Sequence, residues 1–283
     1  MGDIEVLASG YGTVEGPTMD PAGHLYFSDV DNGGVYRLAP SGEVDLVVPR
    51  RKGVAGICAH ADGGIVVGGR DLSHVLDGQS RIILGRDDYP GLGLTDVTGF
   101  QDIHADDQGR VFAGTVRSYD WAGPPSSLLL ITGEKEMTVL YDGVAGSNGL
   151  ALDWVRRRLY HCESNAHRIL VSERTGDHEY TIVDRFSTAE LGGIPDGMAL
   201  DDEGCVWVAI YEAGLIARFS PGGEIVDQMP VPARLVTSVC FRGPDSHDLF
   251  IVSADNIDHP ELQGCVFATT VDAGGARVGS AAV

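Results

Sequence analysis

Four residues with oxygen-bearing side chains occupy matching places in a repeated pattern: Glu15, Gln101, Asn148 and Asp196. Each opens a unit that leads from a turn-like segment into an apolar run. Two of these side chains are carboxylates, and bringing them together in partly desolvated surroundings is unfavourable unless a proton or a cation neutralises them. Carboxylate and amide oxygens suit Ca²⁺, Mg²⁺ or Mn²⁺, and Zn²⁺ is possible. The residue types therefore indicate a divalent metal site.

The units themselves recur along the whole chain. They begin at positions 15, 55, 101, 148, 196 and 237, so they are separated by 40 to 48 residues. This period is typical of propeller blades. Each unit holds short strand-like runs separated by Asp- and Gly-containing turns, and no window shows a sustained helical period. The pattern predicts an all-β, six-bladed β-propeller that forms a single domain over residues 1–283.

The first position of each unit immediately precedes the strand predicted to be innermost. Equivalent positions should therefore ring one mouth of the central channel, and Ala55 and Thr237 complete the set. Asp, Asn and Glu before a strand are also ordinary turn residues. Their recurrence at equivalent positions favours a functional site, with coordination positions left open for water or substrate.

A short strand at the start of the chain, Ile4–Leu7, resembles the strands that end the other units. The sixth unit has strands near residues 239–241, 249–253 and 264–271. The N-terminal strand is therefore expected to pair in this last blade. Such closure removes a sheet edge that would otherwise be free to pair with other chains.

Two stretches are predicted to be irregular, residues 70–100 and 115–128. Both are rich in turn-forming residues. Long loops on a rigid scaffold often carry specificity, and a plain surface excursion is the alternative.

The composition excludes several classes of partner. The net charge of −21 argues against nucleic acid and anionic membranes, which need a basic face, and solubility accounts for the acidity. No run reaches 18 apolar residues, and the start lacks the basic and apolar regions of a secretory signal. The five cysteines are scattered without a CxxC pair, which indicates a reduced, cytoplasmic setting. We expect a small-molecule substrate and a monomer or weak homo-oligomer.

Other catalytic motifs are missing from the sequence. It contains no Gly-x-Ser-x-Gly elbow, no HExxH, no P-loop and no Gly-x-Gly-x-x-Gly in a strand–helix context, so hydride and phosphoryl transfer have no support. His104, His161 and His167 lie in or beside predicted strands and are expected to be structural.

Three of the unit starts also resemble a known family. Glu15-Gly16-Pro17, Ser147-Asn148-Gly149-Leu150 and Ile194-Pro195-Asp196-Gly197-Met198 are similar to the ligand motifs of the senescence marker protein/gluconolactonase/luciferin-regenerating enzyme family, which includes regucalcin. The run from Val206 through Pro230-Val231-Pro232 to Phe241 extends the likeness. The resemblance implies one divalent metal ion, Ca²⁺ first among the candidates, held by Glu15, Asn148 and Asp196. It also implies lactone opening, with the Asp196 carboxylate near the reacting water.

The sequence departs from the family pattern at three places. The family's Asn-Asp-Gly in the third blade is Gln101-Asp102-Ile103, the Arg often found two residues earlier is Gly99, and the fifth blade has Tyr211-Glu212-Ala213-Gly214 where sugar lactonases often have a Gly-rich turn with Trp. Gln101 keeps an amide that can bind substrate or metal-bound water. Loss of the Arg removes a contact to a sugar hydroxyl and weakens the case for gluconolactone itself.

The resulting hypothesis is a metal-dependent hydrolase that opens a sugar lactone or another small lactone at the channel mouth. A bound cation would polarise the ester carbonyl, Asp196 would accept a proton from water, and Gln101 would bind substrate. Two alternatives stay open. One is another reaction at the same site, such as hydrolysis of an ester or phosphotriester or an isomerase or lyase step. The other is a non-enzymatic calcium-binding regulator.

Overall fold

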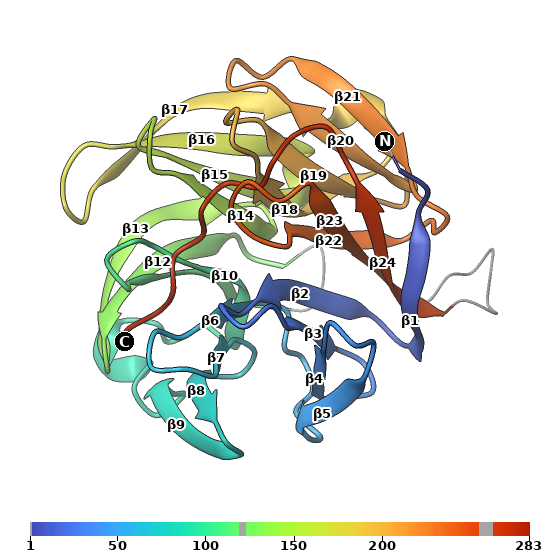
Figure 1. Cartoon of the computed structure of the whole chain (residues 1–283). Helices are drawn as coiled ribbons and strands as arrows, with labels where there is room; N and C mark the ends of the chain where they lie inside the picture. Colours follow the sequence, from blue (N-terminus) through green and yellow to red (C-terminus); the bar gives the residue numbers. More distant parts are fainter. Residues whose placement is uncertain (1, 119–122, 255–262) are drawn as a thin grey trace.

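The computed structural model of the protein describes residues 2–118, 123–254 and 263–283. Its strands form six four-stranded antiparallel sheets, arranged as the blades of a β-propeller (Figure 1). The innermost strand of each blade contacts the innermost strand of the next, and the sixth contacts the first. The predicted six-bladed propeller is confirmed.

The first three blades follow one another along the chain. The first blade contains β2 (Val14–Met19), β3 (Leu25–Asp29), β4 (Val35–Leu38) and β5 (Val44–Val48). The second contains β6 (Ile57–Ala59), β7 (Ile65–Val67), β8 (Leu72–Leu76) and β9 (Gln79–Leu84). The third contains β10 (Gly99–Ala105), β11 (Val111–Val116), β12 (Ser126–Gly133) and β13 (Glu136–Val144), and the 3-10 helix η1 (Pro90–Leu92) precedes it.

The remaining blades continue this order. The fourth contains β14 (Ser147–Asp153), β15 (Arg158–Glu163), β16 (Arg168–Arg174) and β17 (Tyr180–Ser187), with η2 (Ser164–Ala166) after β15. The fifth contains β18 (Ile194–Leu200), β19 (Val206–Tyr211), β20 (Leu215–Phe219) and β21 (Ile225–Pro230), after η3 (Ala189–Leu191). The sixth contains β22 (Val236–Phe241), β23 (Asp248–Ser253) and β24 (Gly264–Thr270).

The strand β1 (Glu5–Tyr11) is the outermost strand of this sixth blade. It pairs antiparallel with β24, from Glu5 opposite Ala268 to Tyr11 opposite Gly264. The first strand of the chain therefore completes the last sheet, in the arrangement that the sequence predicts. The edge of β24 is covered, so the ring is held together by main-chain pairing between distant parts of the chain.

The hydrophobic core lies between neighbouring blades. Phe27 of the first blade, for example, belongs to one buried cluster with Phe250 and Val266 of the sixth. Because the apolar residues pack face to face between blades, the inner strands are free to present polar groups to the central axis. This division of the core positions the site described below.

The prediction of an irregular stretch over residues 70–100 is wrong for its first part. Residues 72–84 form the hairpin of β8 and β9. Its two-residue turn is Asp77-Gly78, with φ of 49° and 74°, and Asp-Gly is a strong hairpin signal. In the second stretch, 115–128, β11 ends at Val116 and β12 begins at Ser126, and residues 119–122 lie outside the described residues.

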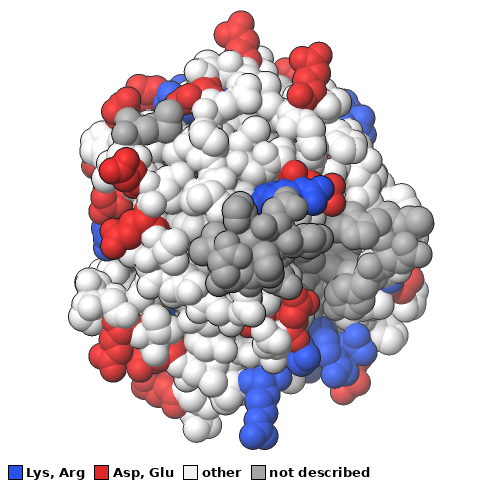
Figure 2. All heavy atoms as spheres, turned by 90° about the vertical axis from the view of Figure 1, so that its right-hand side faces the viewer, with Lys and Arg blue, Asp and Glu red and all other residues white. Residues whose placement is uncertain are grey.

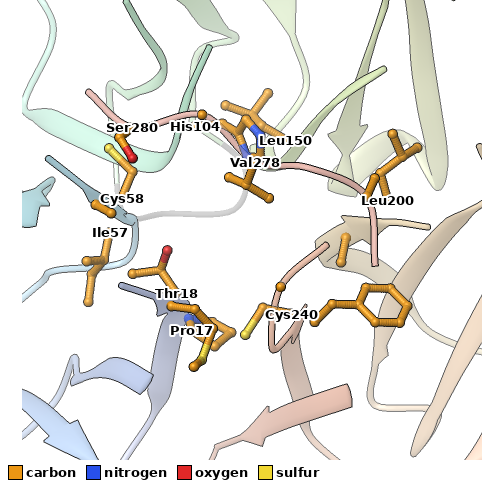
Figure 3. Close-up of a pocket in the computed structure, with 18 of the residues that line it drawn as sticks. Pro17, Thr18, Ile57, Cys58, His104, Leu150, Leu200, Cys240, Val278 and Ser280 are labelled. Carbon is orange, nitrogen blue, oxygen red and sulfur yellow. The ribbon is translucent and has the colours of Figure 1, made fainter. Parts of the chain in front are cut away.

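The C-terminal segment, residues 271–283, crosses one end of the channel. Its main chain bonds to the fifth blade through Ala276 N and Leu200 O at 3.0 Å, and to the second through Ala281 N and Ala59 O at 2.8 Å. Beneath it lies a cavity of about 450 Å³. Figure 3 shows Val278 and Ser280 of this segment at the cavity, which Pro17 and Thr18 also line. The segment therefore covers the channel at this end.

Acidic side chains are dispersed over the face of the molecule that Figure 2 shows. On the face in Figure 2, Asp and Glu are spread widely, and Lys and Arg are fewer and gathered mainly toward the lower right. Among the described residues, no helix is long and apolar enough to cross a membrane.

Candidate active site

The four polar residues singled out by the repeat lie inside the innermost strands, not before them as predicted. Glu15 is in β2, Gln101 in β10, Asn148 in β14 and Asp196 in β18. The prediction placed each residue just before its strand, but each lies within the strand and coincides with an irregularity in strand pairing, such as the one between Pro195 and Met198. A β-bulge changes the direction of a side chain within a strand. The bulges allow these residues to leave the alternating pattern of the sheet.

Three of the four side chains are buried and carry an oxygen without a protein partner. Within the described part of the chain, Glu15 Oε2, Asn148 Oδ1 and Asp196 Oδ1 have no hydrogen-bond donor. Each residue is about 5–6% exposed. A buried polar atom left unpaired is costly, so a set of three calls for a ligand that accepts lone pairs. Two carboxylates and one amide oxygen are hard donors that fit a divalent cation.

The glycine that follows Asn148 has a packing role. A Cβ atom on Gly149 would lie 2.3 Å from the main-chain oxygen of Asp196. Only glycine lets the inner strands of the fourth and fifth blades approach this closely. The Asn-Gly pair therefore places the Asn148 carboxamide beside the Asp196 carboxylate.

The carboxyl groups of the site disfavour one another's ionised forms, and burial adds to this effect. Burial raises the pKa of Glu15 well above its usual value, and the charges of Asp196 and Asp102 add to the effect. Burial and then Asp102 likewise raise the pKa of Asp196, against hydrogen bonds from the Asn148 carboxamide and Gly197 N–H. Clustered carboxylates ionise together only when positive charge balances them.

Asp102 is a third carboxylate near the site, partly exposed, that sequence reasoning did not select. Burial raises its pKa to about 7, and its charge acts on both Glu15 and Asp196. The repeat comparison considered only the first position of each unit, and Asp102 is the second. The bulge between Phe100 and Ile103 contains both residues, of which Gln101 lines a cavity of about 180 Å³ and Asp102 one of about 450 Å³. Asp102 could therefore have been selected only if the position of the bulge had been known.

Gln101 and Asn148 share a small cavity at this end of the channel. The cavity measures about 180 Å³. Its lining is mainly hydroxyl and carboxamide groups, contributed by Gln101, Thr115, Ser118, Ser126, Ser147, Asn148, Ser164 and Asn165. The larger cavity of about 450 Å³ lies toward the C-terminal segment and has a mostly apolar lining. The smaller cavity is lined by Asn148, whose Oδ1 has no hydrogen-bond partner among the described residues.

The glycine at position 99 leaves no room for a side chain. A Cβ atom there would lie 2.4 Å from the main-chain oxygen of Gly69, which accepts a hydrogen bond from Phe100 N at 2.7 Å. The chain at Gly69 thus fills the space that an Arg side chain at position 99 would enter. The close contact between Gly99 of the third blade and Gly69 of the second therefore excludes an Arg at position 99.

A second acidic group lies near the turn after β18 and does not require a cation. Ligand atoms of Asp201, Glu203 and Cys205 lie within 4.8 Å of one another. However, Arg218 contacts both the Asp201 and Glu203 carboxylates at 2.6 Å. Asp201 also accepts from Trp207 Nε1 at 2.9 Å. Arg218 pairs with both carboxylates, so the group is described as a structural ion-pair network.

The three histidines that the sequence analysis named, His104, His161 and His167, lie in different surroundings. His104 lines the larger cavity, and burial lowers its pKa to about 4. His167 Nδ1 lies 3.1 Å from the Gly193 oxygen. His161 is fully buried and lies between Ser147 and Tyr141. His161 adjoins the polar pocket through Ser147, and the structural role expected for the three histidines stays a prediction.

Comparison with known proteins places this geometry in a family. The chain is 32% identical over 263 residues to 6-deoxy-6-sulfogluconolactonase of Pseudomonas putida, covering 89% of this chain and 88% of that protein. It is 33% identical over 249 residues to pentonolactonase XacC of Haloferax volcanii, covering 85% and 81%. Its fold matches that of regucalcin from Agrobacterium tumefaciens, described as a calcium-binding protein, with a TM-score of 0.83, 18% identity and coverage of 100% and 98%.

Residues 13–255 match the model of the protein family described as the SMP-30/Gluconolactonase/LRE-like region. This match spans all six blades, from β2 to the end of β23, and includes every residue of the candidate site. The chain belongs to the SMP-30/Gluconolactonase/LRE-like family.

Proposed function

We propose that this protein hydrolyses a small sugar lactone at the channel mouth formed by the inner strands. The proposal rests on the three unpaired oxygens of Glu15, Asn148 and Asp196. Among the described residues, these buried carboxylate and amide oxygens have no hydrogen-bond partner in the protein. The names of two relatives, a sulfogluconolactonase and a pentonolactonase, support lactones as the substrate class.

Glu15, Asn148 and Asp196 would hold one divalent cation, which we propose to be Ca²⁺. An all-oxygen donor set favours a hard cation, and the structurally similar regucalcin is described as calcium-binding. When bound, the cation would polarise the ester carbonyl and stabilise negative charge on its oxygen.

The protein's own groups would bind and orient the reactants. Gln101 and the surrounding hydroxyls match the hydroxyls of a sugar lactone. Asp196 accepts a proton from the water that attacks the carbonyl carbon, and the ring C–O bond then breaks. The leaving oxygen takes up a proton, which yields the open hydroxy acid.

The working state that we propose is a monomer or weak homo-oligomer in the cytoplasm, without nucleic acid or membrane partners. Four of the five cysteines are buried and all five are free thiols, which suits a reducing setting. The net charge of −21 disfavours polyanionic partners.

The test combines metal removal with a substrate panel. Protein treated with a chelator should lose turnover of pentono- and hexonolactones and regain it with Ca²⁺. Calorimetry should show one Ca²⁺ bound per chain, with binding weakened at least tenfold by Glu15→Gln. Asp202→Asn, which removes an exposed carboxyl after β18, should bind Ca²⁺ normally.

Each other outcome has a distinct meaning. Turnover that survives exhaustive chelation would contradict the metal site. Ca²⁺ binding without turnover of any lactone or ester would favour a calcium-binding regulator. Activity on phosphotriesters alone would indicate a different hydrolase on the same scaffold.

A further inference from the structure

A chain of hydrogen bonds runs from the polar pocket into the protein interior. Ser147 Oγ lies 2.8 Å from His161 Nε2, and His161 Nδ1 lies 3.0 Å from the Tyr141 hydroxyl. Tyr141 is in β13 of the third blade, whereas Ser147 and His161 are in β14 and β15 of the fourth. The chain therefore crosses the interface between two blades.

The pocket end of this chain is a serine hydroxyl. Ser147 lines the cavity of about 180 Å³ together with Gln101 and Asn148. It is the residue before Asn148, at the start of the bulge that extends to Leu150. The Ser147 hydroxyl is thus anchored by His161 and adjoins the space where a substrate would lie.

The histidine in the middle is held in its neutral form. His161 is fully buried, and burial lowers its pKa to about 3. A neutral imidazole has one N–H and one lone pair. Either Tyr141 donates to Nδ1 and Nε2–H donates to Ser147, or Ser147 donates to Nε2 and Nδ1–H donates to Tyr141.

Both hydrogen arrangements leave Ser147 at least one hydrogen-bonding function for a ligand. In the first arrangement its O–H is free to donate, and in the second its oxygen is free to accept. A hydroxyl group can donate and accept, so it is a suitable partner in both cases. A nucleophilic role for Ser147 is disfavoured, because the serine proton would have to move to an imidazole that stays neutral.

We propose that Ser147 binds a ring hydroxyl of the substrate, and that His161 and Tyr141 are positioning residues that orient the Ser147 hydroxyl. This inference rests on the lactone hydrolysis proposed above. It adds a specificity-determining group that lies outside the metal-binding trio. The selection works because a substrate without the matching hydroxyl would leave a buried serine oxygen or proton unpaired.

Steady-state kinetics on the preferred lactone of the wild-type enzyme provide the test. Ser147→Ala should raise KM about tenfold, with kcat changed less than about threefold. Its Ca²⁺ affinity, measured by calorimetry, should stay within about threefold of wild type. Tyr141→Phe removes only the hydroxyl and should raise KM about threefold, because Ser147 loses part of its orientation.

A double-mutant cycle separates positioning from general structural support. If Tyr141 acts through Ser147, adding Tyr141→Phe to Ser147→Ala should raise KM no further. Ser253→Ala provides a matched control in the sixth blade, where a buried serine accepts from Cys265 N at 3.2 Å. It should leave KM unchanged. Melting curves of all variants establish that each is folded under the assay conditions.

Four results would overturn the inference. These are an unchanged KM in Ser147→Ala, additive effects of the two substitutions, a loss of kcat beyond about a hundredfold, and a tenfold loss of Ca²⁺ affinity. The third would make Ser147 a reacting group, and the fourth would make it a support for Asn148. Failure of the wild-type enzyme on every lactone would instead refute the proposed function, and this inference would fall with it.

Discussion

Asn148 and Asp196 come from the inner strands of neighbouring blades, and each presents a buried Oδ1 without a protein donor. The Asn148 carboxamide also donates a hydrogen bond to the Asp196 carboxylate. One side of each group is thus held by protein, and the other is left for a ligand. This arrangement separates the groups that bind from those that orient, and it leads to the predictions below.

Asp196 and Gln101 should respond differently to substitution. Asp196→Asn keeps the shape of the side chain but removes its charge and basicity, so kcat should fall roughly 10²–10⁴-fold at saturating Ca²⁺. Gln101→Ala removes an uncharged group from the pocket lining, so it should mainly raise KM or change lactone preference. Calorimetry should show normal Ca²⁺ binding in Gln101→Ala. Loss of the cation from Gln101→Ala, together with a normal rate in Asp196→Asn, would reverse both assignments.

Removal of the closing strand should destabilise the whole ring. Deletion of residues 1–9 removes most of the pairs between β1 and β24 and the packing of Leu7. At about 1 kcal/mol for each net hydrogen bond, the loss should exceed about 3 kcal/mol and lower Tm by roughly 6–12 °C. Deletion of residues 1–3 keeps the β1–β24 pairs and should cost less. Equal melting of the 1–9 deletion and the full chain would show that β1 does not stabilise the closure.

Burial of His161 should make stability depend on pH. Its pKa is about 3 in the folded protein and near 6.5 when unfolded, so the unfolded chain binds the extra proton between these values. The contribution of neutral His161 to the free energy of unfolding is fully present above pH 6.5. It falls as the pH is lowered, by about 2–3 kcal/mol at pH 4.5. Denaturant unfolding of His161→Gln should show a shallower loss between pH 7 and 4.5. Equal slopes for variant and wild type would mean that His161 is protonated in the folded state.

The C-terminal segment should shield the thiols of the larger cavity. Cys58 and Cys240 both line that cavity, and burial raises the pKa of Cys58 to about 12. Deletion of residues 274–283 should therefore speed the modification of both by a thiol reagent at least tenfold, as mapped by mass spectrometry. Cys162, buried between the fourth and fifth blades, serves as the control. Unchanged rates at Cys58 would show that the segment does not limit access.

Much of the site followed from local patterns in the sequence. The repeat of about 40 to 48 residues predicted six blades, because each blade is built from a nearly contiguous stretch of chain. The same comparison of the repeats selected Glu15, Asn148 and Asp196, each of which has a buried oxygen without a protein partner among the described residues. The Asp77-Gly78 turn was equally local and indicated a hairpin that the sequence analysis overlooked.

Only the tertiary structure decided the features that depend on contacts between blades. The bulge in β10 contains both Gln101 and Asp102, and a period of repeats cannot reveal it. The Ser147–His161–Tyr141 chain joins two blades, and the contact of Gly69 with Gly99 excludes a side chain at position 99. The covering of the channel by residues 271–283 joins distant parts of the chain. Sequence patterns report local periodicity, whereas these contacts arise from the packing of segments that lie far apart in the chain.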